Sequence, residues 1–320
     1  MNHELIAEYL SNTKAPVQLV KHFDEVLDKN KEYPLIAQVK KDGIYTLAVV
    51  IDGALKLYGR TGLKLYWEAD DRVARDVILP DGVYIAELCN PAMSLEQLSG
   101  FVNPNRKKEW TNLECFEMNS LCLYYHDYLT FDELLAGSSD VPYSTRYAKL
   151  QALLSSSGQY DYLIESTLIF NVAEVEVFAN SCIHNGEEGA VFKTMLADWV
   201  AGHKGYRAMK LVRGVSLDLL CTGVLYGKGK RAGQIAALEF SYKGNTFKAD
   251  LGKGWTDERR AELTEAHRVY VKFHQEDSTI DHPIIGKIWE VKALDISSTG
   301  KALRLPKVVR VRWDKEIPDA

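Results

Sequence analysis

Short apolar runs rich in β-branched and aromatic residues recur along the chain, and they predict strands. Residues 35–39 form one run, and residues 45–51 form a second run after a turn that Gly43 allows. The later runs predict strands over residues 55–58, 83–88, 113–118, 163–170, 190–192 and 209–212. Helical spacing of apolar residues predicts helices over residues 19–27, 143–154 and 172–179, the last capped by Asn171. The pattern is typical of an α+β fold.

The pattern changes after Arg213-Gly214. Gly-rich turns now separate short strands, and one helix, opened by Thr256, interrupts them. The predicted strands cover residues 217–225, 235–242, 246–249, 288–294 and 308–313. Several short strands with one helix in about a hundred residues favour a small β-barrel of the OB type. We therefore place a domain boundary at residues 213–216 and expect two domains, residues 1–213 and 214–320.

Composition narrows the class of protein. The 320 residues are 46% hydrophobic and 26% charged, with a net charge of −5, which is ordinary for a globular protein. No apolar run reaches membrane-spanning length, and the residues after Met1 do not predict a signal peptide. The five cysteines form no C-x-x-C pair, which argues against zinc and favours free thiols in a reducing cytosol. We expect a cytoplasmic protein.

Lys40 stands where the first predicted strand ends. A neutral amine is a nucleophile, and a second cation such as Lys41 favours loss of the proton from the first. The plain alternative is a solvated pair of lysines at a turn. Arg60 lies in a turn flanked by glycines, which would hold its cation close to other backbone. The plain alternative is an exposed arginine at a turn.

Two glutamates also stand out. The alternation of its strand puts Glu87 on the same face as Val83 and Ile85, and an acid on an apolar face needs a cation, a metal or several donors. Glu188 lies between glycines and precedes an apolar strand that ends at Lys193. Each is therefore a candidate for a site.

Basic residues concentrate in one part of the acidic chain. Residues 201–254 contain ten lysines and arginines and three acidic residues, densest at Lys228-Gly229-Lys230-Arg231. A charge run is usually a solvated face. Here, where it spans the domain boundary, it fits the binding of a phosphate backbone better.

A series of short motifs joins these candidates. In chain order it comprises Lys40-Lys41-Asp42-Gly43, Arg60-Thr61-Gly62, Glu87, Phe116, Glu188-Gly189-Ala190-Val191-Phe192-Lys193, Lys210 and Arg312-Trp313-Asp314-Lys315. The whole series resembles that of ATP-dependent DNA ligases, which belong with RNA ligases and mRNA-capping guanylyltransferases to the covalent nucleotidyltransferases. The resemblance covers residues 30–316. It implies a nucleotidyltransferase (adenylation) domain with ATP-grasp-like antiparallel sheets and helices, followed by an OB-fold barrel.

The resemblance also implies the reaction. Lys40, with Asp42 beside it, would attack the α-phosphate of ATP and form lysyl-AMP with release of pyrophosphate. AMP would then pass to the 5′-phosphate of a nick in duplex DNA, and the 3′-hydroxyl would displace it. Mg²⁺, held by Glu188 and Glu87, would assist, and Mn²⁺ is expected to substitute.

The remaining roles follow from the same resemblance. Gln38 would contact the adenine edge, Phe116 would stack on the base, and Arg60 with Glu87 would hold the ribose and phosphate region. The plain alternative for Phe116 is a core aromatic. The AMP part of the nucleotide would also be contacted by Val39, Lys193 and Lys210. The triphosphate and the leaving pyrophosphate would be clamped by Arg312, Asp314 and Lys315.

Two positions depart from the pattern of many family members. Tyr45 stands where an arginine is common, and Val212 stands where a second lysine is common. We expect DNA to be bound by other basic residues, namely Lys204, Arg207, Arg213, Lys228, Lys230 and Arg231. The chain leaves no room for a large N-terminal DNA-binding domain, so we expect a minimal two-domain enzyme of phage or bacterial type, monomeric, with no obligate protein partner and no membrane.

Three other functions stay open at this point. An RNA ligase would use the same lysine, although it usually lacks an OB domain ending in Arg-x-Asp-Lys. A capping guanylyltransferase has both domains and is distinguished by labelling with GTP. A non-catalytic OB protein would explain the basic segment but not Lys40, Glu87 and Glu188.

Overall fold

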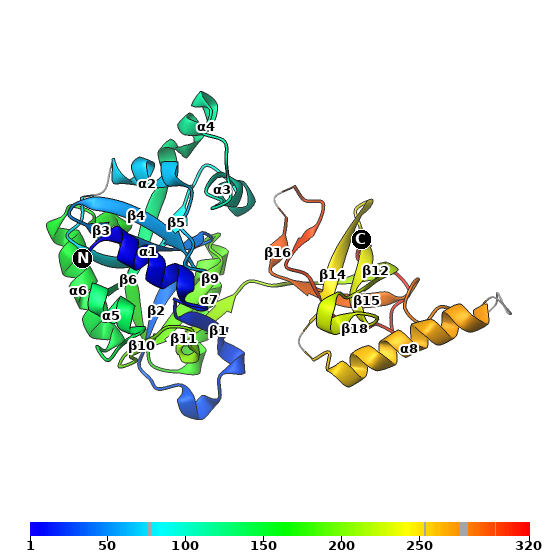
Figure 1. Ribbon diagram of the computed structural model, residues 1–320. Coiled ribbons are helices and arrows are strands. Elements are labelled where there is room, and N and C mark those ends of the chain that lie inside the picture. Colours follow the sequence, from blue (N-terminus) through cyan, green and yellow to red (C-terminus); the bar gives the residue numbers. More distant parts are fainter. Residues whose placement is uncertain (76–77, 253, 275–280, 298) are drawn as a thin grey trace. The chain divides into compact units, whose positions relative to one another are not determined.

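The computed structural model describes residues 1–75, 78–252, 254–274, 281–297 and 299–320 (Figure 1). Contacts within the chain divide it into two compact units, Met1–Val212 and Arg213–Ala320. The division falls one residue before the boundary expected from the sequence. Each unit has its own core and is described separately.

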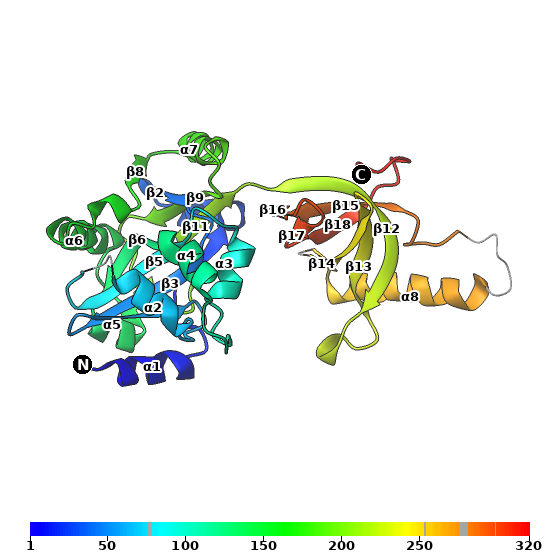
Figure 2. The same cartoon turned by 90° about the horizontal axis from the view of Figure 1, so that it is seen from above.

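Two mainly antiparallel sheets form the framework of the first unit (Figures 1 and 2). The five-stranded sheet has the order β1 (Leu19–His22), β11 (Lys204–Val212), β9 (Gly189–Thr194), β2 (Leu35–Lys40) and β8 (Ser166–Ile169). The four-stranded sheet has the order β4 (Ala54–Gly59), β3 (Ile44–Ile51), β5 (Gly82–Cys89) and β6 (Cys122–Leu129). Only β1 and β11 pair in parallel within these sheets, and a separate short ladder joins β7 (Ser138–Ser139) to β10 (Trp199–Val200).

Seven α-helices accompany these sheets in the described part of the first unit. They are α1 (His3–Asn12), α2 (Trp67–Ala74), α3 (Leu95–Phe101), α4 (Asn112–Glu117), α5 (Phe131–Ala136), α6 (Tyr143–Ser156) and α7 (Val172–His184). Short 3₁₀ turns cover Phe23–Glu25, Asp28–Asn30, Met118–Ser120 and Tyr160–Tyr162. The predicted cap of α7 is confirmed, because the Asn171 side chain accepts a hydrogen bond from the Glu174 backbone N–H at 3.1 Å.

Three apolar cores arrange this unit in layers. Helices α1 and α5 pack on one face of the four-stranded sheet, through residues such as Ile6 and Leu134. The largest core lies on the other face of that sheet, where it includes Ile36 of β2 and Leu150 of α6. Helix α7 covers the opposite face of the five-stranded sheet through Val175. The largest core thus joins the two sheets, and it holds β2, with β9 paired beside it, against the four-stranded sheet.

The second unit is a closed five-stranded barrel, as predicted. Its strands follow the order β12 (Val215–Tyr226), β13 (Ile235–Tyr242), β14 (Asn245–Leu251), β18 (Lys307–Val311) and β15 (Ile288–Ala293). The remaining elements are α8 (Asp257–His274), the 3₁₀ turn Gly229–Arg231, and the short pair β16 (Asp295–Ile296) and β17 (Leu303–Arg304). Closure of the barrel pairs strands that would otherwise expose an edge.

Two predicted elements are wrong. The segment 19–27 is no helix, because its start pairs with β11 as strand β1 and its apolar residues Phe23 and Val26 reach the core from a turn. The segment 113–118 is no strand. Thr111 and Glu114 form a capping box, each accepting a hydrogen bond from the other's backbone N–H, and this starts helix α4. Local capping overrides the apolar composition there.

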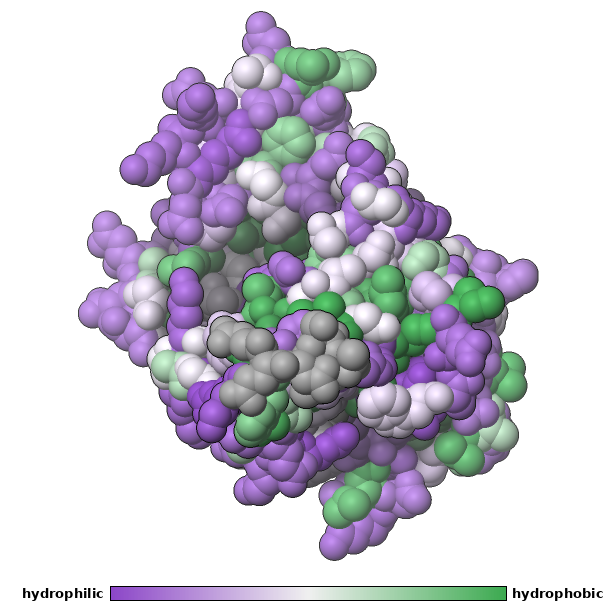
Figure 3. All heavy atoms as spheres, turned by 90° about the vertical axis from the view of Figure 1, so that its right-hand side faces the viewer, coloured by the Kyte–Doolittle hydropathy of each residue, from purple (hydrophilic) through white to green (hydrophobic). Residues whose placement is uncertain are grey.

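The described helices include none long and apolar enough to cross a membrane. On the face shown in Figure 3, hydrophilic residues predominate and hydrophobic residues form smaller groups between them. Scattered apolar residues of this kind are ordinary on protein surfaces.

A buried ion pair holds α6 against β6. Arg146 donates two parallel hydrogen bonds to the Asp127 carboxylate, each at 3.0 Å, and both side chains are almost fully buried. We expect Arg146→Ala to lower the free energy of unfolding by about 3–5 kcal/mol, because the Asp127 charge would stay buried without its partner. Denaturant unfolding measures this change. The matched control is Arg207→Ala, whose partner Asp198 is more exposed, and its expected loss is about 1 kcal/mol or less. Equal losses in the two variants would contradict the prediction.

Candidate active site

Pairing between β2 and β9 brings Lys40 to Glu188, 148 residues away in the chain. The Lys40 ammonium Nζ donates to Oε2 of Glu188 at 2.6 Å, and the two side chains are 17% and 7% exposed. Gly189 makes this approach possible. It has a φ of +147°, and a Cβ there would lie 2.3 Å from the backbone oxygen of Leu211 on β11. Because Gly189 has no side chain, β9 can pair closely with β11. Glu188 then lies directly before the first residue of β9.

A second pair lies next to the first, because Lys41 follows Lys40 and Glu187 precedes Glu188 on antiparallel segments. The ammonium of Lys41 donates to the carboxylate of Glu187, and it also lies 5.0 Å from the ring centroid of Tyr124. Both side chains of this pair are 26% exposed. The pair therefore lies nearer to solvent than Lys40 and Glu188.

Glu87 faces the same cluster from β5 of the other sheet. Burial raises the pKa of Glu87 to about 7, and the nearby Glu188 carboxylate acts in the same direction, whereas Lys40 opposes both. One carboxylate oxygen of Glu87, Oε2, is buried without a hydrogen-bond partner among the described residues. A buried oxygen of this kind is an available ligand for a cation.

The two glutamates fit the donor set of a magnesium site. Mg²⁺ is usually held by one or two carboxylates together with substrate phosphates and water. Within the described ranges, no group of three or more histidine, cysteine, aspartate or glutamate side chains could hold a metal by itself. A metal at Glu87 and Glu188 would therefore take its other ligands from a bound nucleotide and from water.

Lys193 lies deeper between the sheets and is 7% exposed. Its Nζ donates to the backbone oxygen of His126 at 3.1 Å, lies 3.2 Å from Nδ1 of the same residue, and sits 4.1 Å from the ring centroid of Tyr143. Burial lowers the pKa of Lys193 to about 8, although the Asp127 carboxylate opposes this shift. Burial and the Lys193 charge lower the pKa of His126 to about 3, so the imidazole is neutral and can accept.

Lys210 and Arg60 complete the group of cations. Burial and the charge of Lys40 lower the pKa of Lys210, and Glu188 acts in the opposite direction. Arg60 is exposed and close enough to act on both Lys210 and Glu87. Asp42 also acts on Glu87 and raises the pKa of that carboxyl group. The structure thus gathers the predicted phosphate and metal ligands around Lys40.

Gln38 lies two residues before Lys40 on β2 and is 2% exposed. Its Nε2 donates to the backbone oxygen of Ile164 at 3.0 Å, and its Oε1 accepts from the hydroxyl of Tyr143 at 2.8 Å. Successive side chains of a strand alternate, so Gln38 and Lys40 point to the same side, roughly 7 Å apart along β2. Val39, between them, is half-buried.

Tyr45 occupies the position where an arginine was expected. Its ring centroid lies 6.1 Å from that of His126. Burial raises the pKa of Tyr45 well above its usual range, with Asp127 and Glu87 acting in the same direction, so the phenol is neutral. An uncharged side chain thus stands at this strand position, and the ring of His126 lies between Tyr45 and Lys193.

The structure does not bring Phe116 to this cluster. Phe116 is on helix α4, its side chain is 72% exposed, and α4 lies far above β2 and β9 in Figure 1. The interpretation of Phe116 as the stacking aromatic depended on the incorrect strand at 113–118. Its alternative as a core aromatic is also wrong, because the ring is exposed.

The three C-terminal candidates form one ion-pair network in the second unit. Arg312 donates to Asp314 through Nε at 2.9 Å and through Nη2 at 2.6 Å, and its Nη1 donates to Asp218 at 2.7 Å. Lys315 Nζ lies 2.5 Å from the same Asp218 oxygen. Asp218 is buried at 6% exposure, so it holds the two cations close together.

The six candidate DNA-binding residues differ in how much of their charge is already paired. Arg207 pairs with Asp198, Arg213 with Asp295, and Arg231 with Asp257. Three lysines are exposed instead, namely Lys204, Lys228 and Lys230. The exposed lysines are therefore better placed to meet phosphates than the arginines.

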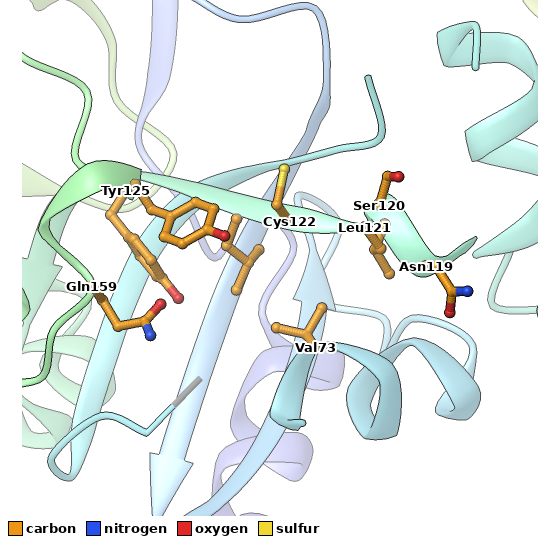
Figure 4. Close-up of a pocket in the computed structure, with 9 residues that line it drawn as sticks. Val73, Asn119, Ser120, Leu121, Cys122, Tyr125 and Gln159 are labelled. Carbon is orange, nitrogen blue, oxygen red and sulfur yellow. The ribbon is translucent and has the colours of Figure 1, made fainter. Parts of the chain in front are cut away.

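A small cavity of about 100 Å³ lies elsewhere in the first unit (Figure 4). It is lined by Val73 of α2, by Cys122 and Tyr125 of β6, and by residues of the 3₁₀ turns Met118–Ser120 and Tyr160–Tyr162. Neither Lys40 nor any of the charged residues around it lines this cavity. This cavity is therefore separate from the cluster of charges around Lys40.

Comparison with known families agrees with this geometry. Residues 16–211 match the family described as the ATP dependent DNA ligase domain, and residues 226–312 match the DNA ligase OB-like domain. The first match contains Lys40, Glu87, Glu188 and Lys210, and the second ends at Arg312. The two matched segments fall within the two compact units.

Individual relatives carry related names. The chain is 28% identical over 200 residues to the DNA ligase of Haloarcula marismortui, an alignment of 59% of this chain and 36% of that protein. It is 28% identical over 291 residues to DNA ligase 1 of Methanosarcina acetivorans, covering 78% of this chain and 49% of the relative. The chain thus spans between about a third and a half of the length of these two curated relatives.

A similar fold occurs among solved structures. One such structure, described as a structure-function analysis of Lig E DNA ligases and of DNA binding with a minimal scaffold, superposes with a TM-score of 0.66. The superposition covers 92% of this chain and 98% of that one, at 16% identity. At this identity the likeness concerns the fold, a two-unit chain with a nucleotidyltransferase-like unit and an OB-like barrel.

Proposed function

Because this chain belongs to the family of ATP-dependent DNA ligases, we propose that it seals nicks in duplex DNA with ATP as the energy source. The observation that carries the proposal is the Lys40–Glu188 pair at the facing ends of β2 and β9, with Glu87 and Lys210 around it. A lone structural ion pair has no need of an orphaned carboxylate oxygen and further cations beside it. A site for phosphoryl transfer needs all of them.

Lys40 is the proposed nucleophile. The amine, once its proton is lost, attacks the α-phosphorus of ATP, a P–N bond forms, and the bond to the pyrophosphate oxygen breaks. The AMP then passes from Lys40 to the 5′-phosphate of the nick. In the last step the 3′-hydroxyl of the nick attacks this activated phosphate, a phosphodiester forms and AMP leaves.

Lys193 and Lys210 are proposed to contact the α-phosphate. Lys193 is buried and Lys210 is half-buried, and burial lowers the pKa of both. Charge-assisted contacts at a water-poor site stabilise a developing phosphate charge strongly. Arg60 is proposed to hold the ribose and phosphate region. Gln38 is proposed to read the adenine edge, with Val39 beside it, and His126 to offer the aromatic surface that Phe116 does not provide.

Glu188 and Glu87 are the proposed ligands of Mg²⁺. The metal, when bound, neutralises phosphate charge and orients the leaving pyrophosphate. Glu188 must exchange its hydrogen bond with Lys40 for this contact, which at the same time frees the amine. The orphaned Oε2 of Glu87 needs no such exchange.

Arg312, Asp314 and Lys315 are proposed to act on the triphosphate of ATP during the first step. In the present arrangement Asp218 holds Arg312 and Lys315 together. A triphosphate would compete with Asp218 for these cations, since phosphates and carboxylates suit the same donors. The exposed Lys204, Lys228 and Lys230 are proposed to contact DNA, with the paired Arg207, Arg213 and Arg231 in support.

The chain is further proposed to act as a monomer, without an obligate protein partner, in a cytoplasm of bacterial or phage-infected cells. All five cysteines are free in the structure, which supports a reducing compartment.

The proposal is tested by intact-mass measurement after incubation with ATP and Mg²⁺. We expect one added AMP per chain, and the added mass should be lost when nicked duplex DNA is supplied, with appearance of the sealed strand. An unchanged mass would refute the proposed activity. Labelling by AMP with transfer only to nicked RNA would instead support the RNA ligase alternative.

A further inference from the structure

Tyr143 connects the two ends of the proposed nucleotide site. It is the first residue of α6 and is 1% exposed. Its hydroxyl lies 2.8 Å from Oε1 of Gln38 and 2.9 Å from the backbone oxygen of His126, while its ring lies under the ammonium of Lys193.

The hydrogen-bond partners fix which way the Gln38 amide points. The backbone oxygen of Ile164 can only accept, so the group that faces it at 3.0 Å must be the Nε2 of Gln38. Oε1 must then face Tyr143. The hydroxyl has a single proton and two oxygen acceptors near it, Oε1 of Gln38 and the backbone oxygen of His126. The His126 oxygen also accepts from Lys193, so we assign the Tyr143 proton to Oε1.

The hydroxyl is protonated at neutral pH and can therefore donate. Burial raises the pKa of Tyr143 well above its usual range, and the Asp127 carboxylate acts in the same direction. On Oε1 of Gln38 one lone pair is left for a ligand, and Nε2 keeps a second N–H, beside which the Tyr147 hydroxyl also lies. Tyr143 and Ile164 together determine which end of the amide carries the acceptor Oε1 and which carries the donor Nε2.

The order matters because adenine and guanine present different edges. Adenine offers a donor at N6 next to an acceptor at N7, which a correctly oriented glutamine matches with two hydrogen bonds. Guanine offers two acceptors, O6 and N7, so a fixed Oε1 meets O6 as a second acceptor. A glutamine free to rotate would present Nε2 to guanine instead and lose this discrimination.

We propose that Tyr143 is a positioning residue that locks the amide of Gln38 and thereby sets the preference of the nucleotide site for adenine over guanine. This inference rests on the proposed function, since it concerns the base of the nucleotide that Lys40 attacks. Tyr143 does not touch the reacting atoms.

The test is self-labelling of Tyr143→Phe with ATP and with GTP. Phenylalanine keeps the ring under Lys193 and the core packing, and removes only the donor to Gln38. We expect the KM for ATP to rise about five- to tenfold with kcat little changed. The reason is that the variant loses one hydrogen bond, and this bond orients a group that binds the base. The ATP to GTP ratio of kcat/KM should fall by about tenfold.

Tyr84→Phe is the matched control. Tyr84 is also fully buried, and its hydroxyl donates to the backbone oxygen of Pro80, in another part of the unit. A purely structural effect of losing a buried hydroxyl would appear in both variants as a lower melting temperature with an unchanged base preference. Adding Tyr143→Phe to a Gln38→Ala background should change the ATP to GTP ratio no further, because the amide that the Tyr143 hydroxyl orients is then absent.

The outcomes separate this inference from the proposed function. If the wild-type chain takes no label from ATP, the proposed function fails, and the inference fails with it. If the wild type is labelled by ATP and Tyr143→Phe keeps the wild-type ratio, the inference alone is overturned. A further loss of discrimination in the double variant would also overturn it, because Tyr143 would then act by a route other than Gln38.

Discussion

Replacement of Lys40 by arginine is expected to abolish self-adenylation, by about 10³-fold or more. Arginine keeps the positive charge and a hydrogen-bond donor for Glu188, so the Lys40–Glu188 pair has a substitute. A guanidinium, however, does not lose its proton in proteins, and it cannot supply the amine lone pair that forms the P–N bond. Intact mass after incubation with ATP and Mg²⁺ measures the loss.

Lys41→Arg is the matched control for this variant. Lys41 follows directly in the chain and has an equivalent acidic partner in Glu187, so the two changes are alike in chemistry. We expect Lys41→Arg to take the label at a rate within about threefold of the wild type, since surface ion pairs contribute little. Equal loss in both variants would show that the segment needs lysines for its structure and that Lys40 has no special part.

A substrate that bypasses the first step adds a second check on Lys40→Arg. A nick that already carries 5′-linked AMP requires only the attack of the 3′-hydroxyl, in which the Lys40 amine does not act as a nucleophile. We expect the variant to seal this substrate while it fails with ATP. Failure on both substrates would indicate a damaged active site.

The local sequence pattern predicts much of the fold. It does so at segments where the intrinsic preference of the residues and their packing in the core favour the same secondary structure. The run at 35–39 became β2, and Asn171 caps α7 as expected. The pairing of β2 with β9 could not be derived from periodicity, because it joins segments about 150 residues apart. The motif order supplied this long-range information, since the resemblance already placed Lys40 and Glu188 in one site.

The errors have equally local causes. Phe116 was placed on a strand because its neighbours are apolar, although the capping box of Thr111 and Glu114 indicates a helix start. His126 was missed even though a signal existed. His126 and Asp127 interrupt an otherwise apolar and aromatic run, and polar residues within a buried strand need partners, which here are Lys193 and Arg146.

The contribution of Tyr143 could not be predicted from the sequence. Tyr143 was assigned to the start of a helix, which is correct, but tyrosine is common at such positions and carries no motif. Its significance arises only when α6 packs beneath β2 and the hydroxyl meets Gln38. A positioning residue depends on tertiary contacts in this way, whereas a nucleophile at a strand end shows in the chain itself.

Glu188→Gln is expected to reduce self-adenylation by about 10²- to 10³-fold, the range seen when one preorganised electrostatic contact is removed from an active site. Glutamine has the same shape, so it can still accept a hydrogen bond from Lys40, and the change removes only the charge. The fold should tolerate it. Loss of the Glu188 charge also relieves its repulsion of Glu87, the carboxyl group whose pKa Glu188 helps to raise to about 7. We therefore expect a melting temperature within a few degrees of the wild type.

The control for this variant is Glu187→Gln, which removes the same charge one residue away and leaves the equivalent partner, Lys41, in place. A general effect of net charge would change both variants alike, whereas a metal ligand at Glu188 requires a large loss of activity in Glu188→Gln and a small loss in Glu187→Gln.

The pKa of Glu87 gives a readout independent of activity. A group with a raised pKa in the folded state stabilises the fold below its unfolded pKa, and this stabilisation is lost as pH rises through about 7. Removing the Glu188 charge should lower that pKa and shift the loss to lower pH, which melting curves between pH 5 and 9 would follow. If Glu188→Gln kept full activity and melted far below the wild type, Glu188 would be a structural partner of Lys40 and no ligand of the metal.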